Sequence, residues 1–387
     1  MRRILVEYAE PGMINARAIH NSEGKVLLAA GTELNDFYIN RLNELGIQSL
    51  YIRDETTGGL TIPETVSERT RVETIKVIRQ AFTQLEDSRR INMLLIKNAV
   101  DKILDEVLSS SNALVHLVDI RAYDDYTFAH SVNVCILSLM TGISLSYNTQ
   151  QLRELGIGAL LHDIGKTRIP KEILDKPSCL TPAEFQEMQE HSFHGFEILR
   201  HYPEIPLLSS HVALQHHERI DGSGYPRQLK GDEIHEYAKI TAVTDVYDAL
   251  LADRIYRPAF LPYGAIRELT RGTYTFFDPR VVAAFLENVA IYPVGSLVQL
   301  NTGDVGIVVD VNKQSQHRPV IRMLLDHHGR KLPDGQEHDL DKMPTIYITK
   351  VFGENVSDSI LRNLKKGIKI DLEKLGQEVK NALGQKG

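Results

Sequence analysis

The sequence predicts a mainly α-helical protein with a small N-terminal α/β module and a small C-terminal β extension. Over most of the chain the apolar residues recur at spacings of three and four, which is the period of a helix with one buried face. From about residue 293 they form short runs separated by turn residues, which is typical of strands. At 387 residues the chain is too long for one typical domain, so two or three are expected.

The N-terminal module is predicted from a strand, helix and strand in succession. GKVLLAAGTEL predicts a strand and a turn, and DFYINRLNELG predicts a short helix with Tyr38, Leu42 and Leu45 on one face. Gly46 stands where a helix commonly ends. IQSLYI then predicts a second strand, and TTGG at 56–59 predicts a linker.

Between Val66 and Leu108 the sequence predicts one long helix, or two helices with a break. The apolar residues of the two halves are spaced by three and four: Ile75, Ile78, Phe82 and Leu85, then Met93, Ile96, Val100, Ile103 and Val107. The two series are out of phase around DSRRIN, which interrupts any coiled coil. Packing on the chain's own domain and homodimerisation both explain this pattern, and the homodimer is slightly favoured.

Changes in period and composition divide the chain into an N-terminal module (1–60), a helical linker (61–110), a histidine-rich helical domain (111–292), a small β domain (293–353) and a basic amphipathic tail (354–387). The β domain is predicted from the strand-like runs SLVQLNTGDVGIVVDVN and RPVIRMLLD, with a turn at TGD. The tail is expected to be a solvated terminal helix, with a partner or a membrane surface as open alternatives.

The bulk composition limits the partners and the location. A net charge of −7 argues against binding to nucleic acid polymers but allows one small anionic ligand. Two cysteines, Cys135 and Cys179, form neither a disulfide framework nor a cysteine metal cluster, which fits a reducing cytosol. The N-terminal apolar stretch is too short for a signal sequence, and the longest apolar run, from Val132, is too short to span a bilayer. We therefore expect a cytoplasmic protein.

Histidines are concentrated in one region, because ten of the 15 lie between His116 and His235. Five of these histidines lie in distinctive segments, and two aspartates accompany them. The residues are His130 in TFAHSVNV, His162 and Asp163 in HDIGK, His191 in HSFHG, His216 and His217 in HHERIDGSGYP, and Asp245 in AVTDVYDAL. Imidazole and carboxylate ligands together suit Fe, Mn, Co or Zn. The set exceeds what one ion needs, and two ions that share a carboxylate would use all of it.

The step His162–Asp163 ends an apolar helical run that includes Leu155 and Leu160. Burying both side chains costs free energy unless each finds a partner. A hydrogen-bonded core pair would meet this need for an isolated His-Asp step. The four other ligand-like segments favour a metal site instead.

In order and spacing, these segments resemble the HD-GYP family, the bacterial cyclic di-GMP phosphodiesterase branch of the HD superfamily. The match runs from about Tyr123 to Pro258, and HHERIDGSGYP is its most specific part. The resemblance implies a helical HD-type metal-dependent phosphohydrolase domain over 111–292. The N-terminal module and the C-terminal β domain also resemble extensions often attached to this domain.

The resemblance also implies roles for single residues. Asp163 would bridge two divalent transition-metal ions, with iron or manganese favoured, and Lys166 would lie beside the bridging water and a substrate phosphate. The remaining roles would be ligands of one ion (His130, His162 and Asp245), ligands of the other (His191, His216 and His217) and contacts to the nucleotide (Tyr225, Arg254 and Arg257). Asp163 and Lys166 would be the catalytic residues.

Elementary chemistry agrees with these roles. Two ions about 3.5–4 Å apart acidify a water and clamp phosphoryl oxygens. Lysine and arginine side chains add cationic contacts to phosphate. Asp248 could orient a ligand histidine or lie on a helix surface, and both alternatives stay open. Glu218 and Asp221 are expected to brace the DGSGYP loop.

One departure from the family concerns a third metal. Some members carry a glutamate four residues before the first histidine, and here that position is Tyr126. We therefore expect two metals.

The expected reaction is hydrolysis of cyclic di-GMP to linear pGpG, with continuation to GMP left open. The alternatives are another cyclic dinucleotide such as cyclic GMP–AMP, a non-catalytic module that senses a nucleotide or binds a partner, and an HD-like di-iron oxygenase. A signalling protein that contacts the GYP loop is a further partner to expect.

Overall fold

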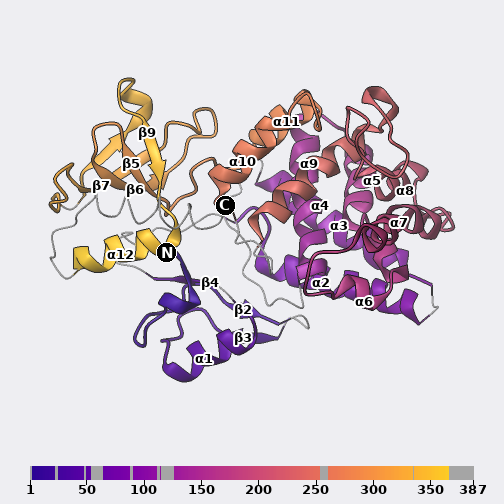
Figure 1. The fold of residues 1–387 in the computed structure, drawn as a ribbon, viewed down its shortest axis with the longest axis horizontal. Helices are drawn as coiled ribbons and strands as arrows, with labels where there is room; N and C mark the ends of the chain where they lie inside the picture. Colours follow the sequence, from indigo (N-terminus) through magenta and orange to yellow (C-terminus); the bar gives the residue numbers. More distant parts are fainter. Residues whose placement is uncertain are drawn as a thin grey trace.

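The computed structural model describes residues 2–21, 25–47, 49–53, 64–87, 90–110, 114, 126–252, 260–333 and 335–365. Its helices α2–α11 form one body, and the C-terminal sheet and the N-terminal module lie beside it (Figure 1). The architecture is the predicted one: a helical domain that a small α/β region precedes in the chain and a β-sheet follows.

The N-terminal module contains two small antiparallel sheets and one helix. Its elements are β1 (Arg2–Leu5) paired with β4 (Ser49–Ile52), β2 (Ile19–His20) paired with β3 (Val26–Leu28), and α1 (Asp36–Glu44). The Asn35 side chain caps α1 by accepting from the Tyr38 amide, and Gly46 has a positive φ of 67° where the helix ends. The predicted helix and the strands at 26–28 and 49–52 are confirmed, whereas β1 was not predicted.

The segment 66–108 contains two helices, α2 (Glu68–Glu86) and α3 (Met93–Ser109). Each begins after a polar cap, Ser67 or Asn92, whose side chain accepts a backbone N–H. Their 3-4-spaced apolar residues, including Ile78, Val100 and Ile103, are buried in a core shared with α4 and α5. Because this face packs inside the same chain, the spacing no longer argues for a homodimer.

The helical body continues with α4 (Tyr126–Ser144), α5 (Thr149–Leu160), α6 (Lys171–Leu174), α7 (Pro182–Leu199), α8 (Leu207–Gln215), α9 (Glu236–Leu251), α10 (Pro262–Arg271) and α11 (Pro279–Leu286). Capping boxes at Asn148 and Thr181 set the starts of α5 and α7. α4 is the central helix and packs against α5, α9 and α11. By length and composition its residues Thr127–Ser144 could cross a membrane, but 72% of them are buried inside the protein.

The C-terminal sheet has five antiparallel strands in the order β8-β7-β6-β5-β9. The strands are β5 (Leu297–Leu300), β6 (Val305–Asp310), β7 (Val320–Leu325), β8 (Glu337–Asp339) and β9 (Ile348–Val351). The predicted TGD turn joins β5 to β6, where Gly303 has a positive φ of 89°. The predicted change of period at about 293 is thus confirmed.

The first part of the tail differs from the expected solvated helix. Helix α12 (Glu354–Lys365) buries Ile360, Leu361 and Leu364 against Leu297 and Ile307 of the sheet. It also contacts β1, so it lies between the sheet and the N-terminal module (Figure 1). The amphipathic pattern was correct, and its apolar face has a partner within the chain.

Candidate metal centre

The seven candidate metal ligands come from five separate parts of the helical body. They are His130 on α4, His162 and Asp163 in the turn after α5, His191 on α7, His216 and His217 at the end of α8, and Asp245 on α9. All are buried except His217, which is partly exposed. The structure brings the seven side chains together at one place in the helical body.

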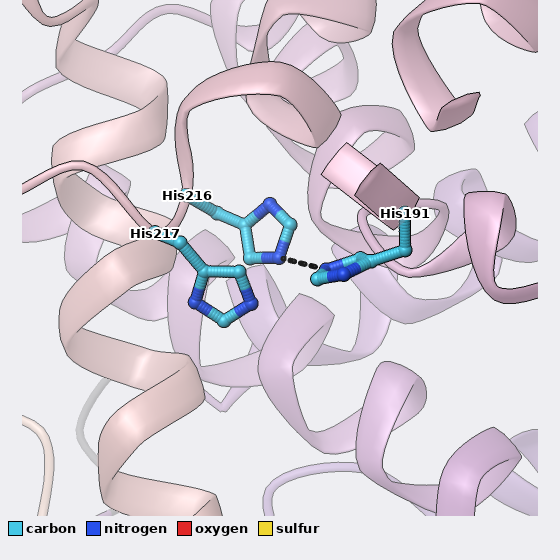
Figure 2. Close-up of side chains that lie close together, drawn as sticks. All are labelled: His191, His216 and His217. Carbon is cyan, nitrogen blue, oxygen red and sulfur yellow. Dashed lines mark hydrogen bonds between the residues drawn. The ribbon is translucent and has the colours of Figure 1, made fainter. Parts of the chain in front are cut away.

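One group consists of His191, His216 and His217, whose ligand atoms lie within 4.8 Å of one another. Figure 2 shows the rings of His191 and His216 facing each other, with His217 on the segment that follows. His191 Nδ1 donates to the Met188 carbonyl and His216 Nδ1 donates to the Ala213 carbonyl. In neutral rings both Nε2 atoms therefore carry lone pairs, yet they are only 3.4 Å apart. Two facing lone pairs of this kind fit a cation between them.

The second group consists of His130, His162 and Asp245, again with ligand atoms within 4.8 Å of one another. His162 Nδ1 donates to the Ala159 carbonyl at 2.8 Å, which leaves its Nε2 as an acceptor. That Nε2 is buried without a hydrogen-bond partner. His130 Nε2 lies 3.0 Å from Asp245 Oδ1. An orphaned buried acceptor costs free energy, and a bound metal ion would remove that cost.

Asp163 lies between the two groups. Its Oδ2 is 3.3 Å from His162 Nε2, and its Oδ1 is 3.5 Å from His191 Nε2 and 3.9 Å from His216 Nε2. Lys166 Nζ donates to Oδ2 at 2.5 Å. One carboxylate thus faces imidazoles of both groups, which is the position required of a shared ligand.

The protonation states of His191, His216 and Asp163 suit metal binding. Burial lowers the pKa of His191 to about 4 and the pKa of His216 to about 3, so both rings are neutral near pH 7. Burial opposes the ionisation of Asp163, but the charge of Lys166 holds its pKa well below the usual value. Neutral imidazoles and ionised carboxylates are the forms that coordinate metals.

Gly165 explains why the turn after α5 can approach α7 so closely. A Cβ at this position would overlap the backbone carbonyl oxygen of His191 and the backbone nitrogen of Gly195. Both obstacles are backbone atoms, which cannot rotate away as a side chain can. The glycine therefore permits the approach that brings Asp163 towards His191, a role that sequence reasoning missed although HDIGK contained the signal.

The DGSGYP loop is stabilised by hydrogen bonds to the side chains of Glu218 and Asp221. Glu218 is buried, and its two oxygens accept the backbone N–H groups of Arg227 (2.7 Å) and Leu229 (3.0 Å). Asp221 accepts from the Ser223 backbone and hydroxyl. These contacts agree with the expected bracing of the loop. The Tyr225 ring lies over His217 with centroids 4.7 Å apart, so the loop reaches the candidate metal ligands.

Several expectations fall on parts of the chain for which no side-chain geometry is described. Arg254 and Arg257 lie within 253–259, outside the described residues. Tyr126 is the first residue of α4, and its side chain is likewise outside the described part.

Asp248 is the one residue for which the sequence left two alternatives and the structure decides. Its Oδ2 accepts from His130 Nδ1 at 2.7 Å, and its Oδ1 accepts from Asn133 at 2.9 Å. Burial opposes the charged form of His130, but hydrogen bonds to Asp245 and Asp248 raise its pKa to about 10. Asp248 therefore orients a candidate ligand and does not lie free on the helix surface.

We expect Asp248→Ala to lower the affinity for metal by about 10–100-fold, because His130 loses the acceptor that fixes its ring. Asp248→Asn keeps an acceptor and should lose less. Competition with a chelator measures both values. Wild-type affinity in Asp248→Ala would show that the hydrogen bond has no effect on the metal centre.

Comparison with known families agrees with this geometry. The family model described as an HD domain matches residues 112–281, which contain all seven candidate ligands. A second model, described as a KOW domain associated with an HD domain, matches residues 297–359, the C-terminal sheet and the start of α12. Residues 112–281 thus form an HD domain, and the segment HHERIDGSGYP lies within it. The KOW match is to a domain that is described as associated with the HD domain.

Curated relatives of this chain include cyclic di-GMP phosphodiesterases. One from Pseudomonas aeruginosa is 40% identical over 256 residues, which are 66% of this chain and 61% of the relative. One from Thermotoga maritima is 37% identical over 213 residues, which are 55% of this chain and 52% of the relative. A 3′3′-cGAMP-specific phosphodiesterase of Vibrio cholerae is 34% identical over 45% of this chain and 38% of the relative. The chain thus spans about half of the length of these relatives.

Among solved structures, the HDG"Y"P protein Bd1817 of Bdellovibrio bacteriovorus is 18% identical, with a TM-score of 0.49. The similarity covers 73% of this chain and 97% of that one.

Proposed function

We propose that the chain is a metal-dependent phosphodiesterase that hydrolyses cyclic di-GMP to linear pGpG. The observation that carries this proposal is the pair of His/Asp groups that meet at Asp163, with the Lys166 ammonium on the same carboxylate. A phosphodiester anion needs its charge neutralised during hydrolysis, and two cation sites beside a lysine supply positive charge. The names of the relatives from P. aeruginosa and T. maritima support this substrate.

The proposed cofactors are two divalent transition-metal ions, iron or manganese, because mixed imidazole and carboxylate sets suit them. His130, His162 and Asp245 would hold one ion, and His191, His216 and His217 the other, with Asp163 shared. When bound, such ions acidify water and neutralise charge on the phosphoryl oxygens. A third ion would need Tyr126 as ligand, and a phenol with a pKa near ~10 is a reluctant one.

The protein's own groups would bind and orient the substrate. The Lys166 side chain is 29% exposed, so its ammonium can reach a substrate phosphate while it stays beside Asp163. Burial raises the pKa of Tyr225, so its hydroxyl stays protonated and can donate to the nucleotide. Arg254 and Arg257 are proposed as further phosphate contacts. The proposal includes a cytoplasmic location, in agreement with the free cysteines Cys135 and Cys179.

The direct test is to incubate the metal-loaded full chain with cyclic di-GMP, cyclic GMP–AMP and cyclic di-AMP, and to resolve the products by chromatography. The proposal expects pGpG from cyclic di-GMP, and GMP is the second product to look for. Cleavage of cyclic GMP–AMP alone would favour the alternative substrate, which the relative from V. cholerae motivates. No cleavage of any of the three cyclic dinucleotides, with iron or with manganese bound, would favour a non-catalytic module.

Lys166→Met should reduce kcat by about 10²–10³-fold, since it removes one charged contact to the reacting phosphate. Bound metal should not change, because the lysine is not a ligand. The matched control is Lys171→Met. The Lys171 side chain is 76% exposed, and its Nζ lies 3.9 Å from Glu86 Oε2. Metal loss in Lys166→Met would instead make the lysine a structural partner of Asp163.

A further inference from the structure

Arg219, in the segment HHERIDGSGYP, is a partly exposed residue whose guanidinium packs on a phenylalanine ring. Its Cζ lies 5.1 Å from the centre of the Phe277 ring, and its Nη1 is buried with no hydrogen-bond partner. In the part of the chain that the structure describes, no ion pair joins Arg219 to a carboxylate. A guanidinium is always charged and carries five donors, so leaving its buried Nη1 without an acceptor costs the protein free energy.

The nearest carboxylates along the chain are already engaged. Glu218 uses both oxygens on backbone N–H groups, and Asp221 accepts from Ser223. Asp245 Oδ1 faces His130. Among the described residues the guanidinium is thus paired with none of these three carboxylates, and because the residue is partly exposed a ligand can supply the missing acceptor.

The loop holds Arg219 next to the metal centre. Arg219 follows His217 by two residues, and a Cβ on Gly224 would overlap the Arg219 backbone nitrogen, so the loop folds tightly back on it. The next residue, Tyr225, stacks over His217. Arg219 thus lies two residues from a candidate ligand, on a loop that folds back over that ligand.

We propose that Arg219 is a phosphate-binding residue of this site, whose guanidinium donates to a non-bridging oxygen of the substrate. The planar fork of an arginine pairs with two phosphate oxygens, and Phe277 holds its face so that the donors stay oriented. That the bound anion is a phosphodiester rests on the proposed function. That Arg219 binds an anion at all does not depend on it.

The test measures binding of inorganic phosphate to the metal-loaded full chain by calorimetry. Arg219→Met should weaken phosphate binding by about 10–100-fold, because a charged hydrogen bond is lost while the contact with Phe277 is kept. Arg219→Lys should recover part of the loss, since it restores the charge without the fork. Arg227→Met is the matched control, because this exposed arginine lies on the same loop, and it should bind phosphate like the wild type.

Bound metal and the unfolding midpoint separate this role from a structural one. Both should be unchanged in Arg219→Met. Phosphate binding equal to the wild type in that variant, or a loss that Arg227→Met shares, would overturn the proposal. Should Arg219→Met fail to fold, Arg219→Lys carries the test, and wild-type affinity for phosphate without the fork would contradict the proposed contact.

Turnover separates this inference from the proposed function. Loss of phosphate binding in Arg219→Met, together with no cleavage of any cyclic dinucleotide by the wild type, would support the anion site and reject the substrate. Cleavage of cyclic di-GMP by the wild type and by Arg219→Met with equal kcat/KM would reject the role of Arg219 alone.

Discussion

Asp163→Asn is expected to abolish hydrolysis, by at least about 10³-fold, and to reduce the metal bound per chain, because the variant removes the anion shared by the two ion sites. The carboxylate of Asp163 faces His162, His191 and His216 at 3.3–3.9 Å, so its charge acts on both groups. Without it, two cations would repel each other across a neutral amide. Elemental analysis after dialysis and product chromatography measure the two effects.

The fold should survive this substitution, because asparagine has the size of aspartate and can still accept from Lys166. Circular dichroism and the urea midpoint test this point. Asp232→Asn is the control, since that side chain is fully exposed and its Oδ1 lies 3.4 Å from Lys239. Full metal content in an active Asp163→Asn variant would show that Asp163 is not the shared metal ligand.

Gly165→Ala should damage both stability and the metal centre. The added Cβ would overlap backbone atoms of His191 and Gly195, so the turn after α5 must move away from α7. We expect a loss of about 3 kcal/mol in the free energy of unfolding, at the upper end for overpacking. Metal affinity should fall as well, because the shift separates Asp163 from His191. Urea unfolding and chelator competition measure the two losses.

Gly353→Ala is the matched control, because a Cβ at Gly353 would meet no atom within 4 Å and the residue has no positive φ. It should change stability by less than about 1 kcal/mol. Normal stability together with normal metal binding in Gly165→Ala would mean that the close approach of the turn to α7 is not needed.

The local pattern of the sequence was sufficient for the helices that carry the candidate ligands. The apolar residues of α5 recur at helical spacing up to Leu160, so His162 and Asp163 could be assigned to its end. The types of ligand were also readable, because imidazole and carboxylate are chemical properties of single residues. The strands of the C-terminal sheet could also be predicted from the sequence, because turn residues separate their short apolar runs.

The packing partners of the amphipathic helices could not be predicted, because they depend on which surface each apolar helix face packs against. The apolar stripes of α2 and α3 suggested a dimer, and the structure buries them against α4 and α5 of the same chain. The tail suggested a solvated helix, and α12 packs on the sheet. Periodicity reports that a face is apolar, but hydrophobic burial is non-directional and does not specify the partner.

Residue types and their spacing were thus enough to predict the fold class, the helical period of the domain and the chemical types of the candidate ligands. The contacts between distant segments were needed to learn which nitrogen of each ring is free, that Asp248 holds His130, and that Gly165 lets the turn approach α7. The fold alone also shows that Nη1 of Arg219 is buried without a hydrogen-bond partner. The physical reason is that hydrogen bonds and backbone contacts between distant segments require distances of a few ångströms, which spacing along the chain does not encode.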